Sequence, residues 1–250
     1  MSEAFAAIVI LGVPSLIAFL VYVFIWRGFR ESRILANAPL GDLARTYAAN
    51  NGYSVLQADI YNSVGLERLR RYLPPGLQTL NGQPMIPMYT STNDERGHFR
   101  SAFILRRTRR GHEMRLFILP VNKQGDGRFC GVAYVAGEIP STNHWLKLYR
   151  EMLPFESGSD HDLESNDFNR KYQLTGSNPK LLTEVFDPLL IERFNNKPAT
   201  SFLGRIRSTV VEFAEEGVLT PELFDEVVKL FEEMQQRFLK AYPSYPEPKA

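Results

Sequence analysis

The residues of this chain best suited to binding chemistry are four closely spaced arginines, Arg106, Arg107, Arg109 and Arg110. The surrounding stretch 96–115 holds seven arginines and one acid, Glu113. A glycine at Gly111 between two apolar runs is typical of a hairpin loop, so the arginines are expected at a compact, positive tip. Such a tip can dock on anionic lipid, where each basic residue contributes about 1 kcal/mol, or on a protein partner.

Two other interpretations of this basic tip stay open. It can pair with the acidic stretch 156–167, in the same chain or in a second copy, although exposed pairs contribute only about 0–1 kcal/mol each. It can also be an ordinary solvated hairpin. Nucleic acid is not expected as a partner, because no aromatic residues are interleaved with the arginines to stack on bases.

An enzyme is the alternative hypothesis, and its first candidates are Asp160, His161 and Glu164. Acids at alternate positions here resemble the start of a calcium loop. The full loop fails, because Ser165 stands where the sharp turn needs glycine and Lys171 where a bidentate glutamate belongs. The sequence therefore favours a solvated acidic loop and predicts no metal site, with a membrane-bound hydrolase kept as the alternative function.

Other catalytic patterns are absent from the sequence. The four histidines are scattered singly, no CxxC pair exists, and no phosphate-binding glycine loop is found. Ser177 and Lys180 match S-x-x-K literally, but the partner motifs of the acyl-enzymes are missing, so helix capping is expected. The single Cys130 lies in an apolar run and is expected to be an inert buried thiol. We therefore predict no catalytic residue and no cofactor.

Residues 5–26 form an uncharged stretch of 22 residues, which as a helix spans about 33 Å and crosses the roughly 30 Å hydrocarbon core of a bilayer. A cleaved signal peptide fits less well, because the stretch lacks a basic flank before it and a small-residue cleavage site after it. The residues just beyond it are rich in arginine, namely Arg27, Arg30 and Arg33. The positive-inside rule then places residues 1–4 outside and the rest in the cytoplasm, which predicts a single-pass protein of the cell membrane.

The remainder of the chain has the composition of a folded domain. The whole sequence is 44% hydrophobic with a formal net charge of +1, so global charge gives no attraction to nucleic acid. We expect one soluble domain over 34–242, with a sub-boundary near 156–162 left open, and a disordered tail at 243–250.

Periodicity predicts an α+β fold with an antiparallel β meander and packed helices. Strands are expected over 53–57, 85–90, 99–107, 113–121, 129–136, 167–174 and 206–214. Helices are expected over 34–52, 63–72, 144–152 and 179–194, the last one kinked at Pro188, and from Thr220 onward with a core-facing apolar stripe.

One segment resembles the ES-x-x-FNR signature of a bacterial protein family, through Glu164, Ser165, Phe168, Asn169 and Arg170. The later stretch 217–239 is also similar to that family, whose members have an N-terminal membrane helix and no assigned function. The resemblance implies a membrane-anchored cytoplasmic α+β domain and transfers no catalytic residue, cofactor or substrate. From the residues themselves, a structural role is expected, with Phe168 and Tyr172 in the core. Because the sequence combines a basic tip with a predicted membrane anchor, we expect an interaction or scaffold module.

Overall fold

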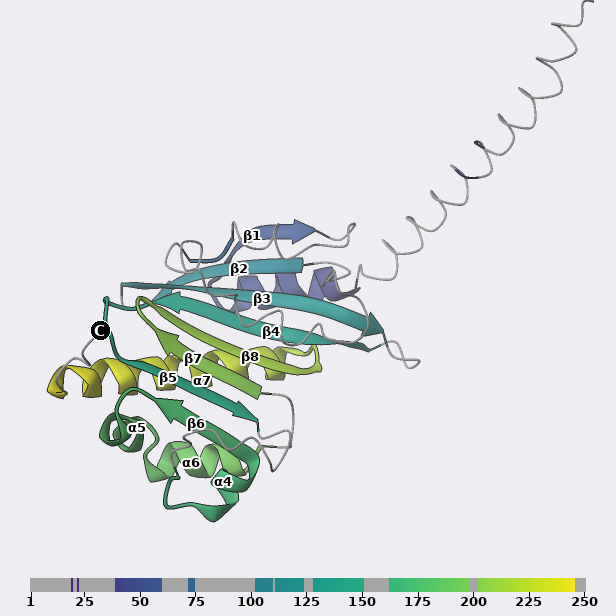
Figure 1. The fold of residues 1–250 in the computed structure, drawn as a ribbon. Coiled ribbons are helices and arrows are strands. Elements are labelled where there is room, and N and C mark those ends of the chain that lie inside the picture. The colour runs from purple at the N-terminus through teal and green to yellow at the C-terminus, as the bar shows by residue number, and fades with distance from the viewer. Residues whose placement is uncertain are drawn as a thin grey trace, which may run out of the picture.

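The computed structural model of the chain contains one antiparallel β-sheet with helices packed on one of its faces (Figure 1). It describes residues 19, 22, 39–59, 72–74, 102–109, 111–123, 128–150, 162–197 and 202–245. The eight strands of the sheet lie in the order β1-β2-β3-β4-β8-β7-β5-β6. Their bounds are β1 Ser54–Asp59, β2 Ala102–Arg109, β3 His112–Lys123, β4 Phe129–Glu138, β5 Trp145–Arg150, β6 Tyr172–Gly176, β7 Phe202–Arg207 and β8 Val210–Val218. The predicted α+β class with an antiparallel meander is confirmed.

The β7–β8 hairpin joins the early and late parts of the sheet. Strands β1 to β4 pair in sequence order, and β8 then pairs with β4, with Phe213 opposite Val135. On its other side the hairpin continues through β7 to β5, with Ile206 opposite Leu146. Strands from both ends of the chain are therefore hydrogen-bonded into one sheet.

The helices of the described residues comprise one over 39–50 and four that are bounded by clear sequence signals. The latter are α4 Asn166–Lys171, α5 Pro179–Val185, α6 Pro188–Asn195 and α7 Pro221–Ala241, the last followed by the short 3₁₀ turn η2 Tyr242–Ser244. Asn178, Asp187 and Thr220 cap α5, α6 and α7, each with a proline at the first helical turn. Proline suits that position because its missing N–H would have no helical partner there.

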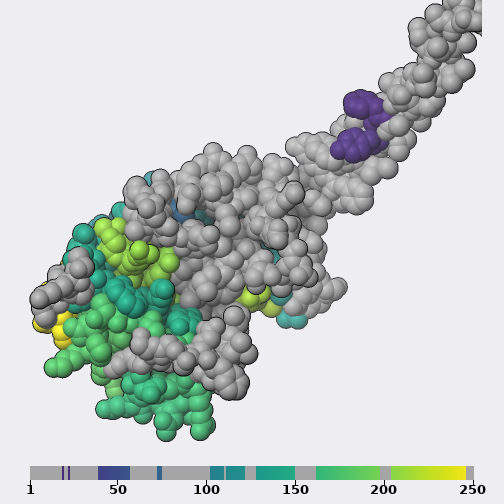
Figure 2. Space-filling model, in the orientation of Figure 1, coloured from purple at the N-terminus to yellow at the C-terminus, as the bar shows by residue number. Residues whose placement is uncertain are grey.

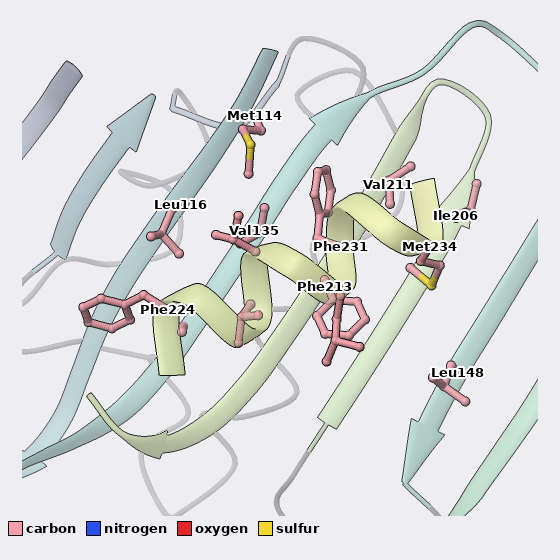
Figure 3. Close-up of a cluster of buried hydrophobic side chains, with 14 of the residues drawn as sticks. Met114, Leu116, Val135, Leu148, Ile206, Val211, Phe213, Phe224, Phe231 and Met234 are labelled. Carbon is pink, nitrogen blue, oxygen red and sulfur yellow. The ribbon is translucent and has the colours of Figure 1, made fainter. Parts of the chain in front are cut away.

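Helix α7 crosses one face of the sheet and buries its apolar stripe there (Figure 3). Phe231 and Met234 of α7 pack with Phe213 of β8 and Val135 of β4 in the main hydrophobic cluster. A Cβ on Gly137 would lie 2.6 Å from the Phe231 ring, so a glycine is what lets helix and sheet approach here. The predicted core-facing stripe of this helix is confirmed.

The other face of the sheet, which we call the second face, carries a smaller cluster. Phe117, Val132, Tyr134 and Ala214 are buried in it together with Leu73, which lies outside the sheet. Arg115 of β3 ties the segment 72–74 to this face, because its guanidinium donates to the carbonyls of Tyr72 and Leu73 at 2.6 and 3.0 Å.

Three predicted elements are wrong. Residues 145–150 form strand β5, not the expected helix over 144–152, because Leu146 and Leu148 alternate into the main cluster. Residues 166–171 form helix α4 and only 172–176 form a strand, since Ser165 caps the segment. The expected strand over 206–214 is a hairpin, in which Ser208 turns the chain with a φ of +56°.

Several predictions fall outside the described residues. The membrane segment 5–26 does so except for Phe19 and Tyr22, as do Arg27, Arg30, Arg33, the strand 85–90, and the helix predicted over 63–72 except for Tyr72. Within the described part of the chain, no helix combines the length and the apolar character that crossing a bilayer requires.

Candidate functional site

The second face changes character along the sheet. Its residues on β2, β3, β4 and β8 include the apolar Ile104, Phe117, Val132 and Ala214, all buried. On β5 and β7 the positions that alternate with the buried Leu146, Leu148 and Ile206 are instead aromatic or basic. Because side chains of a strand alternate between faces, these residues all lie on the second face. On the second face, β5 and β7 therefore carry aromatic and basic side chains, whereas the other strands carry buried apolar ones.

Four residues define this site, which we call the β5–β7 site: Trp145, Lys147, Arg205 and Arg207. Trp145 lies directly opposite Arg207 and Lys147 opposite Arg205 in the antiparallel register. Together with Ile206 they line a hollow of about 300 Å³. Directly opposed residues of a β pair have Cβ atoms about 5 Å apart, so the four side chains form one compact group.

The β5–β7 site is open to solvent. Trp145 is 39% exposed, and Lys147 and Arg207 are both exposed. Figure 2 looks onto this face, and teal and yellow-green segments lie side by side at its surface. Trp145 is therefore an exposed aromatic side chain that lies next to two cations, Arg207 on the neighbouring strand and Lys147 on its own strand.

Arg205 forms an ion pair with a buried acid on the neighbouring strand β8. Its guanidinium donates to Oε2 of Glu212, a residue only 1% exposed, at 2.6 Å from Nε. The hydroxyl of the buried Tyr134 donates to the other oxygen, Oε1, at 2.7 Å. Burial, followed by the neighbouring Glu212 charge, raises the pKa of Tyr134 well above its ordinary value, so it stays a hydrogen-bond donor. The pair neutralises one of the three cations, while Lys147 and Arg207 form no ion pair with an acid in the described part of the chain.

The start of β5 is also fixed in place. The backbone N–H of Trp145 donates to Ser177 Oγ at 3.1 Å, and the N–H of Ser177 donates to the Trp145 carbonyl at 2.9 Å. The same hydroxyl lies 3.3 Å from Nδ1 of His144, whose ring is fully buried. Ser177 therefore holds the loop before α5 against the strand that carries Trp145.

This arrangement can bind an anion next to an apolar or aromatic surface. Two unneutralised cations attract negative charge, and the indole ring supplies apolar area with a polar N–H. The Ser177 hydroxyl accepts from the N–H of Trp145 and donates to its carbonyl, so its role is to position the start of β5. In the described ranges, no three of His, Cys, Asp and Glu gather in a geometry that could hold a metal ion.

The four arginines at the β2–β3 hairpin do not share one surface. Arg107 and Arg109 point to the face covered by α7 and both bind Glu232, at 2.7 and 2.5 Å. Arg106 alternates to the second face and is exposed, and Arg110 lies outside the described residues. The expected single positive tip is therefore wrong for these three residues, because neighbouring positions of a strand face opposite ways. A docking role for Arg106 and Arg110 stays a prediction.

Arg107 is built into the fold. Its side chain is 19% exposed, lies over the Tyr53 ring at 4.6 Å from the ring centre, and also donates to the Asn51 carbonyl at 3.4 Å. The pKa of Tyr53 is raised to about 12, chiefly by burial, which the Arg107 charge partly offsets. These contacts tie the first helix, the hairpin and α7 together.

The signature residues make structural contacts. Ser165 Oγ accepts from the N–H of Phe168 at 3.3 Å as the N-cap of α4, and Asn169 exchanges two hydrogen bonds with the backbone of Leu163. Phe168 is fully buried, with its ring 5.9 Å from Phe186 and 6.0 Å from Phe194.

The remaining signature residues, Glu164 and Arg170, are exposed. Asp160 and His161, the other candidates of the enzyme hypothesis, lie outside the described residues.

Sequence reasoning did not identify the β5–β7 site, because residues 144–152 were assigned to a helix. The signal was present in the alternation over 145–149, where Leu146 and Leu148 alternate with Trp145, Lys147 and Tyr149. Strand β7 places Arg205 and Arg207 at the same spacing. Two short strands with basic residues at alternate positions indicate one basic face, but not that the two strands are neighbours.

No protein-family model matches the chain, and no curated protein matches it. Among solved structures, it is similar to the mycobacterial trehalose monomycolate transport factor A, TtfA. The match has 12% sequence identity and a TM-score of 0.49, and covers 84% of this chain and 98% of that chain.

Proposed function

We propose that this chain is a membrane-anchored binding module whose β5–β7 site docks on anionic lipid headgroups. In this proposal residues 5–26 span the membrane, residues 1–4 lie outside, and the domain lies in the cytoplasm. The observation that carries the proposal is the exposed Trp145 set directly opposite Arg207, beside Lys147.

The residue types of the site support a lipid surface as the partner. Lysine and arginine near a membrane are attracted to the negative potential of the cytoplasmic leaflet, at about 1 kcal/mol for each residue. Tryptophan prefers the headgroup level, where its ring meets the apolar boundary and its N–H stays hydrated. An acidic protein surface would satisfy the cations, but an exposed indole between them fits the mixed polarity of an interface better.

The predicted anchor supports the same partner. A domain tethered by a membrane helix remains close to the bilayer, so even weak docking contacts act at a high effective concentration. Lys147 and Arg207, which pair with no acid among the residues that the structure describes, contribute about 2 kcal/mol, which is enough to bias the orientation of a tethered domain but not to recruit a free one.

Arg106 extends the proposed surface. It lies on the same face as the β5–β7 site, and the register places Arg106, Arg115, Ala136, Glu212, Arg205 and Lys147 in one row across the sheet. Glu113 and Glu212 pair with Arg115 and Arg205 respectively, so Arg106 and Lys147 are the exposed cations of the row. Arg106 thus assists docking at one side, while the β5–β7 site provides the main contact.

Fluorescence of the reconstituted chain tests the proposal. The chain has two tryptophans, so Trp26→Phe leaves Trp145 as the only reporter. The full chain is placed in vesicles of brominated phosphatidylcholine, with or without phosphatidylglycerol. We expect quenching of Trp145 only in the anionic vesicles. Lys147→Glu combined with Arg207→Glu removes about 2 kcal/mol of attraction and adds repulsion, so the docking equilibrium should fall by at least about 30-fold and the quenching should disappear.

A matched control carries the same change of charge elsewhere. Lys180→Glu with Lys229→Glu alters two exposed lysines of α5 and α7 and should leave the quenching intact. Arg106→Glu with Arg110→Glu measures the contribution of the hairpin in the same assay. Quenching that is equal in neutral vesicles, or that survives reversal of Lys147 and Arg207, contradicts the proposal. An unquenched Trp145 in both vesicle types rejects lipid docking and leaves a protein partner.

A further inference from the structure

A second hollow lies between the tip of the β2–β3 hairpin and the C-terminal half of α7, on the opposite face of the sheet from the β5–β7 site. We call it the hairpin–helix cleft. Its volume is about 400 Å³, within the range of about 300–1,000 Å³ that small-molecule sites occupy. The hairpin contributes Arg109, His112 and Met114, and α7 contributes residues between Glu232 and Lys240.

The acid in the cleft is already neutralised. Arg107 donates to one oxygen of Glu232 at 2.7 Å and Arg109 donates to the other at 2.5 Å. Glu113, at the margin, accepts from Arg115 Nε at 2.7 Å. Two guanidinium groups on one carboxylate leave a net positive charge beside the cleft, and the exposed Lys240 adds another. The cleft is therefore electropositive although acids line part of it.

Donors of this cleft remain available for a ligand. The side chain of Arg109 is 54% exposed and uses Nη1 for Glu232, so part of its guanidinium faces solvent. The Lys240 ammonium and the His112 ring lie along the same opening. Gln235 is not available to a ligand in this way, because it is buried and its Nε2 donates to the Glu138 carbonyl at 3.2 Å.

Apolar surface lies next to these donors. Met114 is buried in the cleft wall, and Leu239 is partly buried against the main hydrophobic cluster. Met adapts its shape to irregular apolar groups, which suits a site that accepts a compact hydrocarbon or aromatic body. Positive donors on one side and Met114 with Leu239 on the other match a molecule with one acidic end and one apolar end.

We propose that the hairpin–helix cleft binds a small organic carboxylate whose apolar body rests on Met114 and Leu239. Arg109 and Lys240 hold the carboxylate, and Glu232 keeps the Arg109 guanidinium in position. This site is independent of the lipid-docking surface, because the two lie on opposite faces of the sheet.

Fluorine NMR on the full chain in nanodiscs tests this site, with 4-fluorophenylacetate as the probe and empty nanodiscs as the blank. The carboxylate should bind saturably, and the neutral analogue 2-(4-fluorophenyl)ethanol at least about tenfold more weakly. Arg109→Gln with Lys240→Gln should weaken the carboxylate by at least about tenfold, and Leu239→Ala should weaken it with all charges kept.

Lys229→Gln removes one exposed charge from α7 outside the cleft and should bind the probe as the native chain does. Circular dichroism of each variant checks that α7 is retained. Equal binding of the acid and the alcohol, native affinity in the Arg109 and Lys240 double variant, or no saturable binding by the native chain would overturn the proposal.

Discussion

At the scale of single residues, the molecule depends on which face of a strand each charge occupies. Arg106 and Arg107 are adjacent in sequence, yet one is exposed on the second face and the other is bound to Glu232 beneath α7. Arg205 and Glu212 pair across β7 and β8 because register places them opposite one another. The buried Tyr134 hydroxyl completes that pair, so one phenol supports the placement of a surface arginine.

Tyr134→Phe tests this support. Without the hydroxyl, Glu212 loses one of its buried donors, and the free energy of unfolding should fall by about 1–3 kcal/mol. The measurement is urea unfolding at neutral pH. Tyr245→Phe removes an exposed hydroxyl that donates to Glu184 and should cost clearly less. An equal loss of unfolding free energy in the two variants would show that the buried Tyr134 hydrogen bond contributes no more to stability than the exposed one.

The raised pKa of Tyr134 also predicts how the stability of the fold changes at alkaline pH. The pKa of Tyr134 lies well above the ordinary value of 10.0 in the folded state, so the folded protein holds this proton more tightly than the unfolded chain. Its contribution to stability is complete below pH 10 and is lost as the pH rises above it. Tyr134→Phe should therefore flatten the loss of stability above pH 10.

At the scale of elements, helix ends connect the parts of the fold. The segment expected as one kinked helix is two, α5 and α6, because Pro188 begins a new helix with Asp187 as its cap. Asp187 Oδ1 accepts from the N–H of Leu190 at 2.9 Å, and Oδ2 binds Arg237 of α7. Burial raises the pKa of Asp187, but the hydrogen bonds from Arg237 and Leu190 outweigh it, so the pKa lies below the ordinary value of 3.8.

Replacing Asp187 separates the cap from the ion pair. Asp187→Ala removes both and should lower the free energy of unfolding by about 0.5–2 kcal/mol, whereas Asp187→Asn keeps the cap and should cost less.

Because the folded pKa of Asp187 is depressed, the stabilisation is present above the ordinary pKa and is lost as the pH falls through the folded value. Unfolding measured from neutral pH to about pH 3 should show a smaller acid-induced loss for Asp187→Asn than for the native chain. Asp162→Asn, at an exposed acid, is the control and should follow the native curve.

At the scale of the whole molecule, the β7–β8 hairpin makes one sheet from two parts of the chain. Strand β8 pairs with β4 over nine residue pairs, from Cys130 opposite Val218 to Glu138 opposite Val210. Helix α7 then packs across β4 and β8, so the main cluster extends from Leu116 on β3 to Leu148 on β5. On this face, apolar contacts connect the meander with the later strands.

A single cooperative unfolding transition is expected from this arrangement. Ile118→Val removes one buried methyl group in β3 and should cost about 0.5–1.5 kcal/mol. In the Trp26→Phe background, fluorescence of Trp145 reports on β5, while circular dichroism reports on the whole fold. Ile118→Val should shift the urea midpoints of both signals equally. A shift in circular dichroism without one in Trp145 fluorescence would show two separately folding parts.

The sequence predicted those parts of the fold that depend on short-range patterns. The alternation in 102–109 and 112–123, the glycine of the first hairpin, and the capped start of α7 at Thr220 all act through neighbours within a few residues. The predictions failed where two local patterns competed. Residues 166–171 contain a capped helical turn beside a strand, and the alternation over 145–149 ends at Arg150, where a third apolar residue would continue the pattern.

By itself, the sequence determined an α+β domain, the apolar stripe of its last helix, the strands 102–109 and 112–123, and the hairpin between them. These features follow from propensity, capping and periodicity, which are local properties. Only the tertiary structure decided that β5 lies beside β7, that Trp145 and Arg207 meet, and that Glu232 binds two arginines. Those contacts join residues far apart along the chain. They arise because the long-range pairing and packing that bury the core also bring distant side chains onto a common face, and no local pattern contains that information.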